Sequence, residues 1–231
     1  MSREIEKDYD YMISFLASYQ LTDIVEQGNL MQMLKTMHRK LYAYMVFLNE
    51  MESKSIMSKN ETIYHRETVS DMISALFCWV NGTYKSSKLH LRSGIESFVK
   101  AITCNGCPEI LITKSVYEVF DLAKQSHEFS FDYTKNKIES LHSEYASLCA
   151  TVHGSMDKMA GVGGLIQFPC YTEKEAKEIS DVFLRIISSY LSTIYYVYYD
   201  NVYEIHELNR DLFLQGIEKS EKKIIYNLIN S

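Results

Sequence analysis

The sequence predicts an all-α fold, built as a single-domain antiparallel bundle of seven or eight helices over residues 1–231. The chain contains only two prolines and nine glycines, so few positions interrupt a helix. Apolar residues recur at steps of three and four along most of the chain, which is the period of a helix with one buried face. No segment shows the strict alternation that is typical of a half-buried strand.

The composition is that of a folded protein and restricts the classes of partner. Apolar residues make up 46% and charged residues 23% of the 231 positions, which argues against disorder. The formal net charge of −6 argues against a protein that coats DNA. No apolar stretch is long enough to cross a bilayer, and the N-terminus lacks the apolar core of a signal peptide. We therefore expect a cytoplasmic protein without membrane contact, with its five cysteines reduced.

The first 52 residues predict two helices, separated by Gly28-Asn29. The first, over about 8–20, is expected to bury the side chains that share one face: Tyr11, Met12, Phe15, Leu16 and Tyr19. The second begins at Leu30 and carries an apolar seam at alternating steps of three and four: Leu34, Met37, Leu41, Tyr44, Leu48 and Met51. Such a seam packs a helix lengthwise along a neighbour, either within the chain or across a dimer, and the intrachain packing is the commoner arrangement.

The next two helices are marked by clear start and stop signals. Ser58 and Glu61 have the spacing of a capping box, and Asn81-Gly82 ends the helix that follows. A further helix over about 84–103 is expected to bury Leu91, Ile95, Phe98, Val99 and Ile102.

The remaining chain predicts four helices and one long loop. The helices are expected over about 110–126, with Ile112 inward, over about 134–153, from Thr172 to about 204, and after Asn209. Thr172 and Glu175 have the spacing of a second capping box, and Asn209 is the expected cap of the last helix. Residues 154–171 contain four glycines and a proline and are expected to form a partner-binding or lid loop, because long loops in compact domains are commonly functional.

Three polar residues are the candidates for a functional site. Arg92 and Glu96 lie four residues apart on the flank of the 84–103 helix, where they can form an ion pair. His153 ends the 134–153 helix directly before Gly154 and can exchange protons near neutral pH. The structural alternatives are an ordinary surface ion pair for the first two and a helix C-terminus that favours a positive charge for the histidine.

Cysteine and histidine spacing offers a separate hypothesis, a zinc site. Cys104 and Cys107 form one C-x-x-C pair, and Cys149 with His153 forms a second, looser pair. Thiolate and imidazole ligands at these spacings close a tetrahedral site only if the two pairs meet in space. We expect no metal and no cofactor, and we keep this zinc-stabilised domain as an alternative.

Two segments together resemble the HEPN superfamily, the higher eukaryote and prokaryote nucleotide-binding proteins. LRSGIESF (Leu91–Phe98) resembles its Arg-x-x-x-Glu helix, and LCATVHG (Leu148–Gly154) resembles the end of its histidine helix. The resemblance implies a helical core over about 59–206, with flanking helices at 8–52 and 209–230. Active members of this family are metal-independent ribonucleases that act as dimers, with the two histidine helices meeting at the interface. Many of them are prokaryotic toxins or antiviral effectors, and the resemblance implies a similar setting for this chain.

The chain departs from the family pattern at one catalytic position. The family has an arginine separated from the histidine by four to six residues, where this chain has Ala146, Ser147 and Leu148, and no arginine occurs between residues 93 and 184. We therefore expect a non-catalytic binding or regulatory module of a prokaryotic defence or toxin–antitoxin system, acting as a homodimer or with a protein partner. The alternative is a metal-independent ribonuclease that uses His153 with Arg92 and Glu96, with RNA as its ligand.

Overall fold

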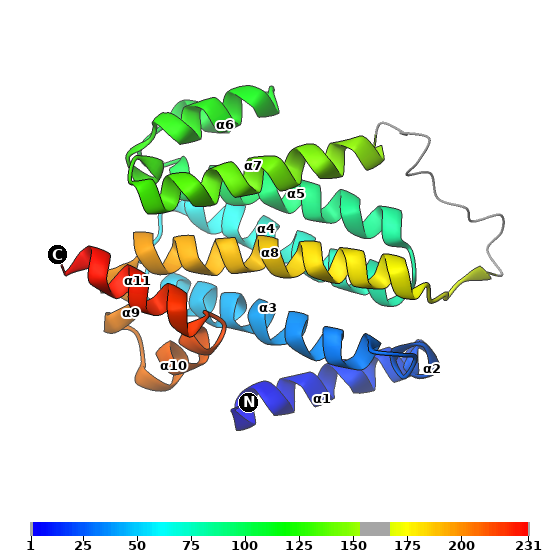
Figure 1. Cartoon of the computed structure of the whole chain (residues 1–231). Coiled ribbons are helices and arrows are strands. Elements are labelled where there is room, and N and C mark those ends of the chain that lie inside the picture. Colours follow the sequence, from blue (N-terminus) through cyan, green and yellow to red (C-terminus); the bar gives the residue numbers. More distant parts are fainter. Residues whose placement is uncertain (1, 153–166, 231) are drawn as a thin grey trace.

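The structure, a computed structural model, describes residues 2–152 and 167–230, and the secondary structure of this part is entirely helical. The all-α prediction is thus confirmed, but the described residues form eleven α-helices and two short 3-10 helices rather than seven or eight helices. Several of the additional helices are short and lie between the long ones (Figure 1).

The elements, in chain order, are α1 (Arg3–Ser18), α2 (Thr22–Val25), α3 (Leu30–Ser53), α4 (Lys59–Val80), α5 (Tyr84–Thr103), η1 (Pro108–Leu111), α6 (Val116–Gln125), η2 (His127–Phe129), α7 (Asp132–Val152), α8 (Glu173–Val197), α9 (Tyr199–Glu204), α10 (Glu207–Gln215) and α11 (Lys219–Ile229). Residues 153–166, which include most of the expected loop at 154–171, lie outside the described part of the chain.

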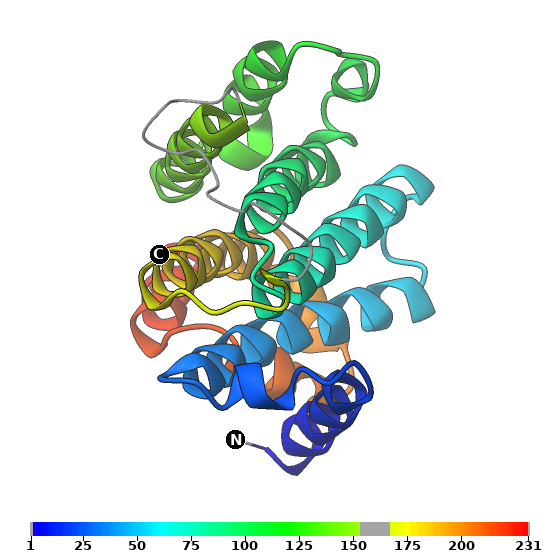
Figure 2. The same ribbon diagram turned by 90° about the vertical axis from the view of Figure 1, so that its right-hand side faces the viewer.

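The long helix α8 lies at the centre of the bundle. It packs against α3, α5 and α7, and α5 packs in turn against α4 (Figures 1 and 2). Helix α1 lies beneath α3 at one edge, and α6 lies beside α7 at the opposite edge (Figure 1). No helix in the described ranges has both the length and the apolar character needed to cross a membrane.

A continuous apolar core joins these helices, and its largest fully buried side chains include Trp79, Tyr190 and Phe98. The predicted seam of α3 belongs to this core, because Leu34, Met37, Leu41, Tyr44, Leu48 and Met51 are all buried. Helix α3 packs on helices of the same chain, chiefly α10, α8 and α4, so the intrachain interpretation of the sequence pattern is confirmed.

The start and stop signals of α4 have the predicted geometry. Ser58 and Glu61 form both halves of a capping box: the Glu61 amide donates to Ser58 Oγ at 3.3 Å, and the Ser58 amide donates to Glu61 Oε2 at 2.7 Å. Gly82 ends the helix with a φ of +74°, a conformation that side chains rarely adopt. A Cβ at this glycine would also lie 2.2 Å from the Cys170 carbonyl oxygen, so the turn requires glycine.

The predicted buried face of α1 is correct for Leu16, and Met12 packs against the core, but it is wrong for the three aromatic residues. Tyr11, Phe15 and Tyr19 are at least half exposed, whereas Ile5, Tyr9 and Leu16 are buried. Helix α1 lies at the edge of the bundle and packs mainly on α3, so only a narrow stripe of its surface is covered.

Other boundary predictions fail for similarly local reasons. Ile112 is 83% exposed, because η1 ends before it and α6 begins only at Val116. Thr172 begins α8, but its side chain makes no capping hydrogen bond, and its amide instead donates to the Tyr84 hydroxyl at 3.0 Å. The expected helix to residue 204 is broken at Tyr198 into α8 and α9. Asn209 lies inside α10 and donates to Glu50 at 2.6 Å.

A small group of polar side chains is buried inside the aromatic core. Tyr44 and His65 share a hydrogen bond of 2.6 Å, and the Tyr198 hydroxyl donates to Glu61 Oε1 at 2.7 Å. His65 is fully buried, and this burial lowers its pKa from 6.5 to about 4. The imidazole is therefore neutral in the folded protein at neutral pH.

The buried imidazole predicts a specific loss of stability in acid. The unfolded chain protonates His65 near its ordinary pKa of 6.5, but the folded chain does so only near about 4. The unfolded state therefore binds the extra proton first, and the free energy of unfolding falls by about 3 kcal/mol as the pH drops through this window.

Urea unfolding at pH 7 and pH 4.5 measures this loss. The variant His65→Gln retains an acceptor for Tyr44 but does not titrate, so it should lose about 2–3 kcal/mol less than the wild type between the two values. The exposed His127→Gln is the matched control and should retain the wild-type dependence. An identical pH dependence in the wild type and His65→Gln would contradict this assignment.

Candidate functional site

The contact between α5 and α7 brings together the polar residues that the sequence singles out. On α5, Leu91 and Ile95 point into the core, which leaves the adjacent Arg92 at the edge that faces α7. On α7, Leu141 and Leu148 are buried, and Tyr145 and Cys149 lie one turn apart on the flank of that stripe.

Arg92 is bound to α7 through two of its nitrogen atoms. Nη2 donates to the Tyr145 hydroxyl at 2.7 Å, and Nε donates to Cys149 Sγ at 3.2 Å. The guanidinium also lies over the Tyr145 ring, with its Cζ atom 5.0 Å from the ring centroid. This side chain therefore fixes the position of α5 relative to α7.

The protonation states fit this arrangement. Burial raises the pKa of Tyr145 to about 12, although the Arg92 charge acts in the opposite direction, so the phenol is neutral near pH 7. Burial opposes the charge of Arg92, but its contacts with Cys149 and Tyr145 outweigh this and raise its pKa. The cluster thus contains one permanent positive charge, and its hydrogen-bond acceptors are a hydroxyl oxygen and a sulfur rather than a carboxylate.

Glu96 has a different partner from the one expected. Its Oε1 accepts a hydrogen bond from Lys100 Nζ at 2.8 Å, one turn further along α5. The Lys100 ammonium is mostly buried and lies 5.9 Å from the centre of the Tyr64 ring on α4. Among the described residues no ion pair joins Arg92 to Glu96, so the predicted pair is replaced by this one.

His153 lies outside the described residues, and α7 is described as far as Val152. The three residues before it at which the resemblance leads one to expect an arginine are described. Ala146 and Ser147 are exposed and Leu148 is buried, so none of them carries a cationic group. The Arg92 guanidinium nevertheless contacts the residues on either side of these positions, Tyr145 and Cys149. A cationic group from α5 thus lies beside the turn of α7 that contains Ala146, Ser147 and Leu148.

The described cysteines of the alternative zinc site do not meet. Cys149 contacts Arg92, whereas Cys104 lies twelve residues further along α5, which corresponds to roughly 18 Å of helix. Burial also raises the pKa of Cys104 to about 11, whereas a zinc ligand must be a thiolate. In the part of the chain that is described, no group of three or more His, Cys, Asp or Glu side chains is placed to hold a metal ion.

Sequence reasoning missed Tyr145, Lys100 and the role of Cys149 as a partner of Arg92. Tyr145 and Cys149 are 53 and 57 residues from Arg92, and no local spacing indicates such contacts. Comparisons of the chain with family models, with curated proteins and with solved structures find no match. A functional assignment therefore depends on the chemistry of these contacts.

From the contacts of Arg92 we predict that Arg92→Met is less stable than the wild type. Methionine retains an unbranched apolar side chain but has none of the N–H donors of the guanidinium. The Tyr145 hydroxyl and the Cys149 thiol then lose their partner, and the free energy of unfolding should fall by about 1–2 kcal/mol. Arg66→Met is the control, because Arg66 is exposed and pairs only with Glu52 on the surface, and it should change stability less. Both changes are measured by urea unfolding, and wild-type stability in Arg92→Met would show that the contact does not hold the helices.

Proposed function

We propose that this chain is a HEPN-like helical binding or regulatory module that acts through contact with a second copy or a protein partner rather than through catalysis. The observation that carries the proposal is the engagement of both described candidate residues in contacts between or along helices. Arg92 is bound to Tyr145 and Cys149, and Glu96 is bound to Lys100.

These contacts occupy the groups that phosphodiester cleavage requires. A metal-independent ribonuclease needs cationic donors directed at the phosphate oxygens, where negative charge develops in the transition state. Two nitrogens of Arg92 already donate within the chain, and the Glu96 carboxylate already accepts from a mostly buried ammonium. In this arrangement the site supplies rigidity to the α5–α7 pair, and rigid helical surfaces are suited to recognition.

The surface supports a role in protein contact. Large apolar side chains are exposed on α1 and α4, including Phe15, Tyr19 and Ile73, and contiguous apolar surface commonly marks a protein interface. We propose by analogy with the HEPN superfamily, and on no other ground, that this module belongs to a prokaryotic defence or toxin–antitoxin system.

A second candidate function, metal-independent ribonuclease, is favoured by one observation. The Arg92 guanidinium lies beside Tyr145 and Cys149, which flank the positions where the family places its arginine. In this alternative, Arg92 supplies the missing positive charge from α5, and His153 is the acid or base.

An RNA cleavage assay with purified protein in the presence of a metal chelator separates the two candidates. The binding-module proposal predicts that the wild type and His153→Ala leave a single-stranded RNA equally intact. It also predicts, in sedimentation experiments, a dimer or a stable complex with a copurified partner, unchanged by His153→Ala. Cleavage that His153→Ala abolishes would instead establish the ribonuclease, and a lone monomer at every concentration would contradict the contact-based function.

A further inference from the structure

A groove with charged and hydroxyl-bearing side chains in its lining runs along the bundle between α3 and α8, on residues that the sequence did not single out. Its main cavity has a volume of about 420 Å³ and continues into a smaller one of about 110 Å³. Arg39 and Lys40 from α3 and Arg185 from α8 line it, together with Glu218 from the turn before α11. We call this surface the α3–α8 groove.

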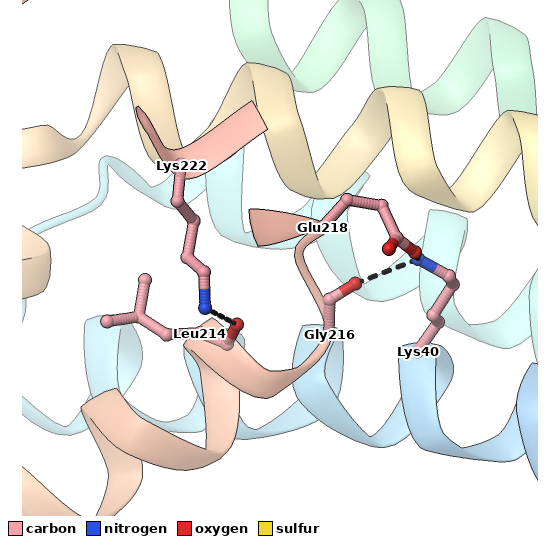
Figure 3. Close-up of polar contacts among 5 residues, drawn as sticks. All are labelled: Lys40, Leu214, Gly216, Glu218 and Lys222. Atoms are coloured by element: carbon pink, nitrogen blue, oxygen red, sulfur yellow. Dashed lines mark hydrogen bonds and ion pairs between the residues drawn. The ribbon is translucent and has the colours of Figure 1, made fainter. Parts of the chain in front are cut away.

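Lys40 is the buried charge of this groove. Its side chain is only 5% exposed, and its Nζ donates to the Gly216 carbonyl oxygen and to Glu218 Oε1, both at 3.0 Å (Figure 3). Gly216 directly follows α10, so the lysine satisfies a carbonyl group at that helix end. The Glu218 side chain, in contrast, is 63% exposed and is free to turn away.

Two further cationic groups lie along the same groove. Arg39 has a buried Nε atom without a hydrogen-bond partner among the described residues. Arg185 is about half exposed, and it pairs with Glu144 on α7 through Nε and Nη2, at 2.5 and 3.3 Å. The main cavity is therefore lined by three positive charges and one carboxylate, within a chain whose net charge is −6.

Hydroxyl groups fill the spaces between these charges. The main cavity is lined by Thr36 from α3, Ser140 from α7, and Ser188 and Ser189 from α8. The smaller cavity adds Ser192 and the ion pair between Lys137 and Glu221. Hydroxyl donors beside guanidinium and ammonium groups are the combination that binds phosphate oxygens. The Glu218 carboxylate already occupies the anion position on Lys40, and that lysine, followed by Arg39 and Lys222, lowers its pKa.

We propose that the α3–α8 groove binds a small phosphomonoester, whose phosphate replaces the Glu218 carboxylate on Lys40. Lys40 retains the Gly216 carbonyl oxygen, so its burial needs no change in the fold. Arg39 gains the partner that its Nε lacks, and the serine hydroxyls donate to the remaining phosphate oxygens. This site shares no residue with the Arg92 cluster, so the inference goes beyond the proposed function and does not depend on it.

The dimensions and the charge favour a small ligand over a nucleic acid. A cavity of about 420 Å³ lies in the range of small-molecule sites. A polyanion would also meet the overall negative charge of the chain, whereas one phosphate group meets only the local positive charges.

Isothermal titration with inorganic phosphate and with glycerol 3-phosphate, at constant ionic strength in sodium chloride, tests the site. Glu218→Gln removes the competing carboxylate charge and should bind both probes about tenfold more tightly than the wild type. Arg39→Met and Lys40→Met should each bind at least about tenfold more weakly. Arg39→Met is the informative variant if the loss of the buried Lys40 prevents folding.

Lys222→Met is the matched control. Lys222 also donates to a carbonyl at the end of α10, that of Leu214 at 3.0 Å, but it does not line the groove (Figure 3). Its loss should leave the affinity for both probes within about twofold, because Lys222 contacts neither cavity and has the smallest effect of the three charges that lower the pKa of Glu218. An absence of binding in both the wild type and Glu218→Gln, or unchanged binding in Arg39→Met, would overturn the proposal. Tighter binding of an RNA hexamer without terminal phosphates would overturn it in favour of a nucleic acid.

Discussion

The contact of the Arg92 guanidinium with Tyr145 and Cys149 is the interaction on which the functional interpretation depends. A guanidinium retains its charge at any physiological pH, so its position at the α5–α7 contact requires acceptors and an aromatic face. The structure supplies an oxygen, a sulfur and a ring from one side of α7. If these contacts serve mainly to hold the helices, the residues that look catalytic in the sequence are structural. If the contacts are weak, the same guanidinium becomes available for an anion.

A second constraint operates at the end of α10, where carbonyl groups lack partners within the helix. Lys40 and Lys222 donate to two of these carbonyls, from α3 and α11 (Figure 3). The absence of a side chain at Gly216 allows the end of α10 to lie close to α3, because a Cβ there would lie 2.5 Å from the Cβ of Ala43. The hydrogen bond from Lys40 to a carbonyl group at the end of α10 thus also places a buried ammonium group in the lining of the α3–α8 groove. The charge stabilises the turn and remains adjacent to a cavity.

Local features of the fold could be predicted from the sequence, but the partners of polar side chains could not. The Ser58–Glu61 capping box and the α3 seam depend on residues within a few turns of each other, and both were predicted correctly. The face of α1 depends on which helices cover it, and the sequence does not reveal this. Similarly, the contact between Lys40 and Glu218 joins residues 178 positions apart, with no motif at either end. Glu96 is an exception, because Lys100 lies four residues after it in the favoured order for a helical ion pair, so the sequence itself offers this partner beside Arg92.

A double-mutant cycle between Arg92 and Tyr145 measures the central contact most directly. Arg92→Met and Tyr145→Phe each remove one side of the hydrogen bond, and the double variant removes both, with the aromatic ring retained throughout. From the free energies of unfolding in urea, we predict a favourable coupling of about 1–2 kcal/mol between the two side chains. A coupling indistinguishable from zero would contradict the account, because the hydrogen bond between Arg92 and Tyr145 would then contribute nothing to the stability of the α5–α7 contact.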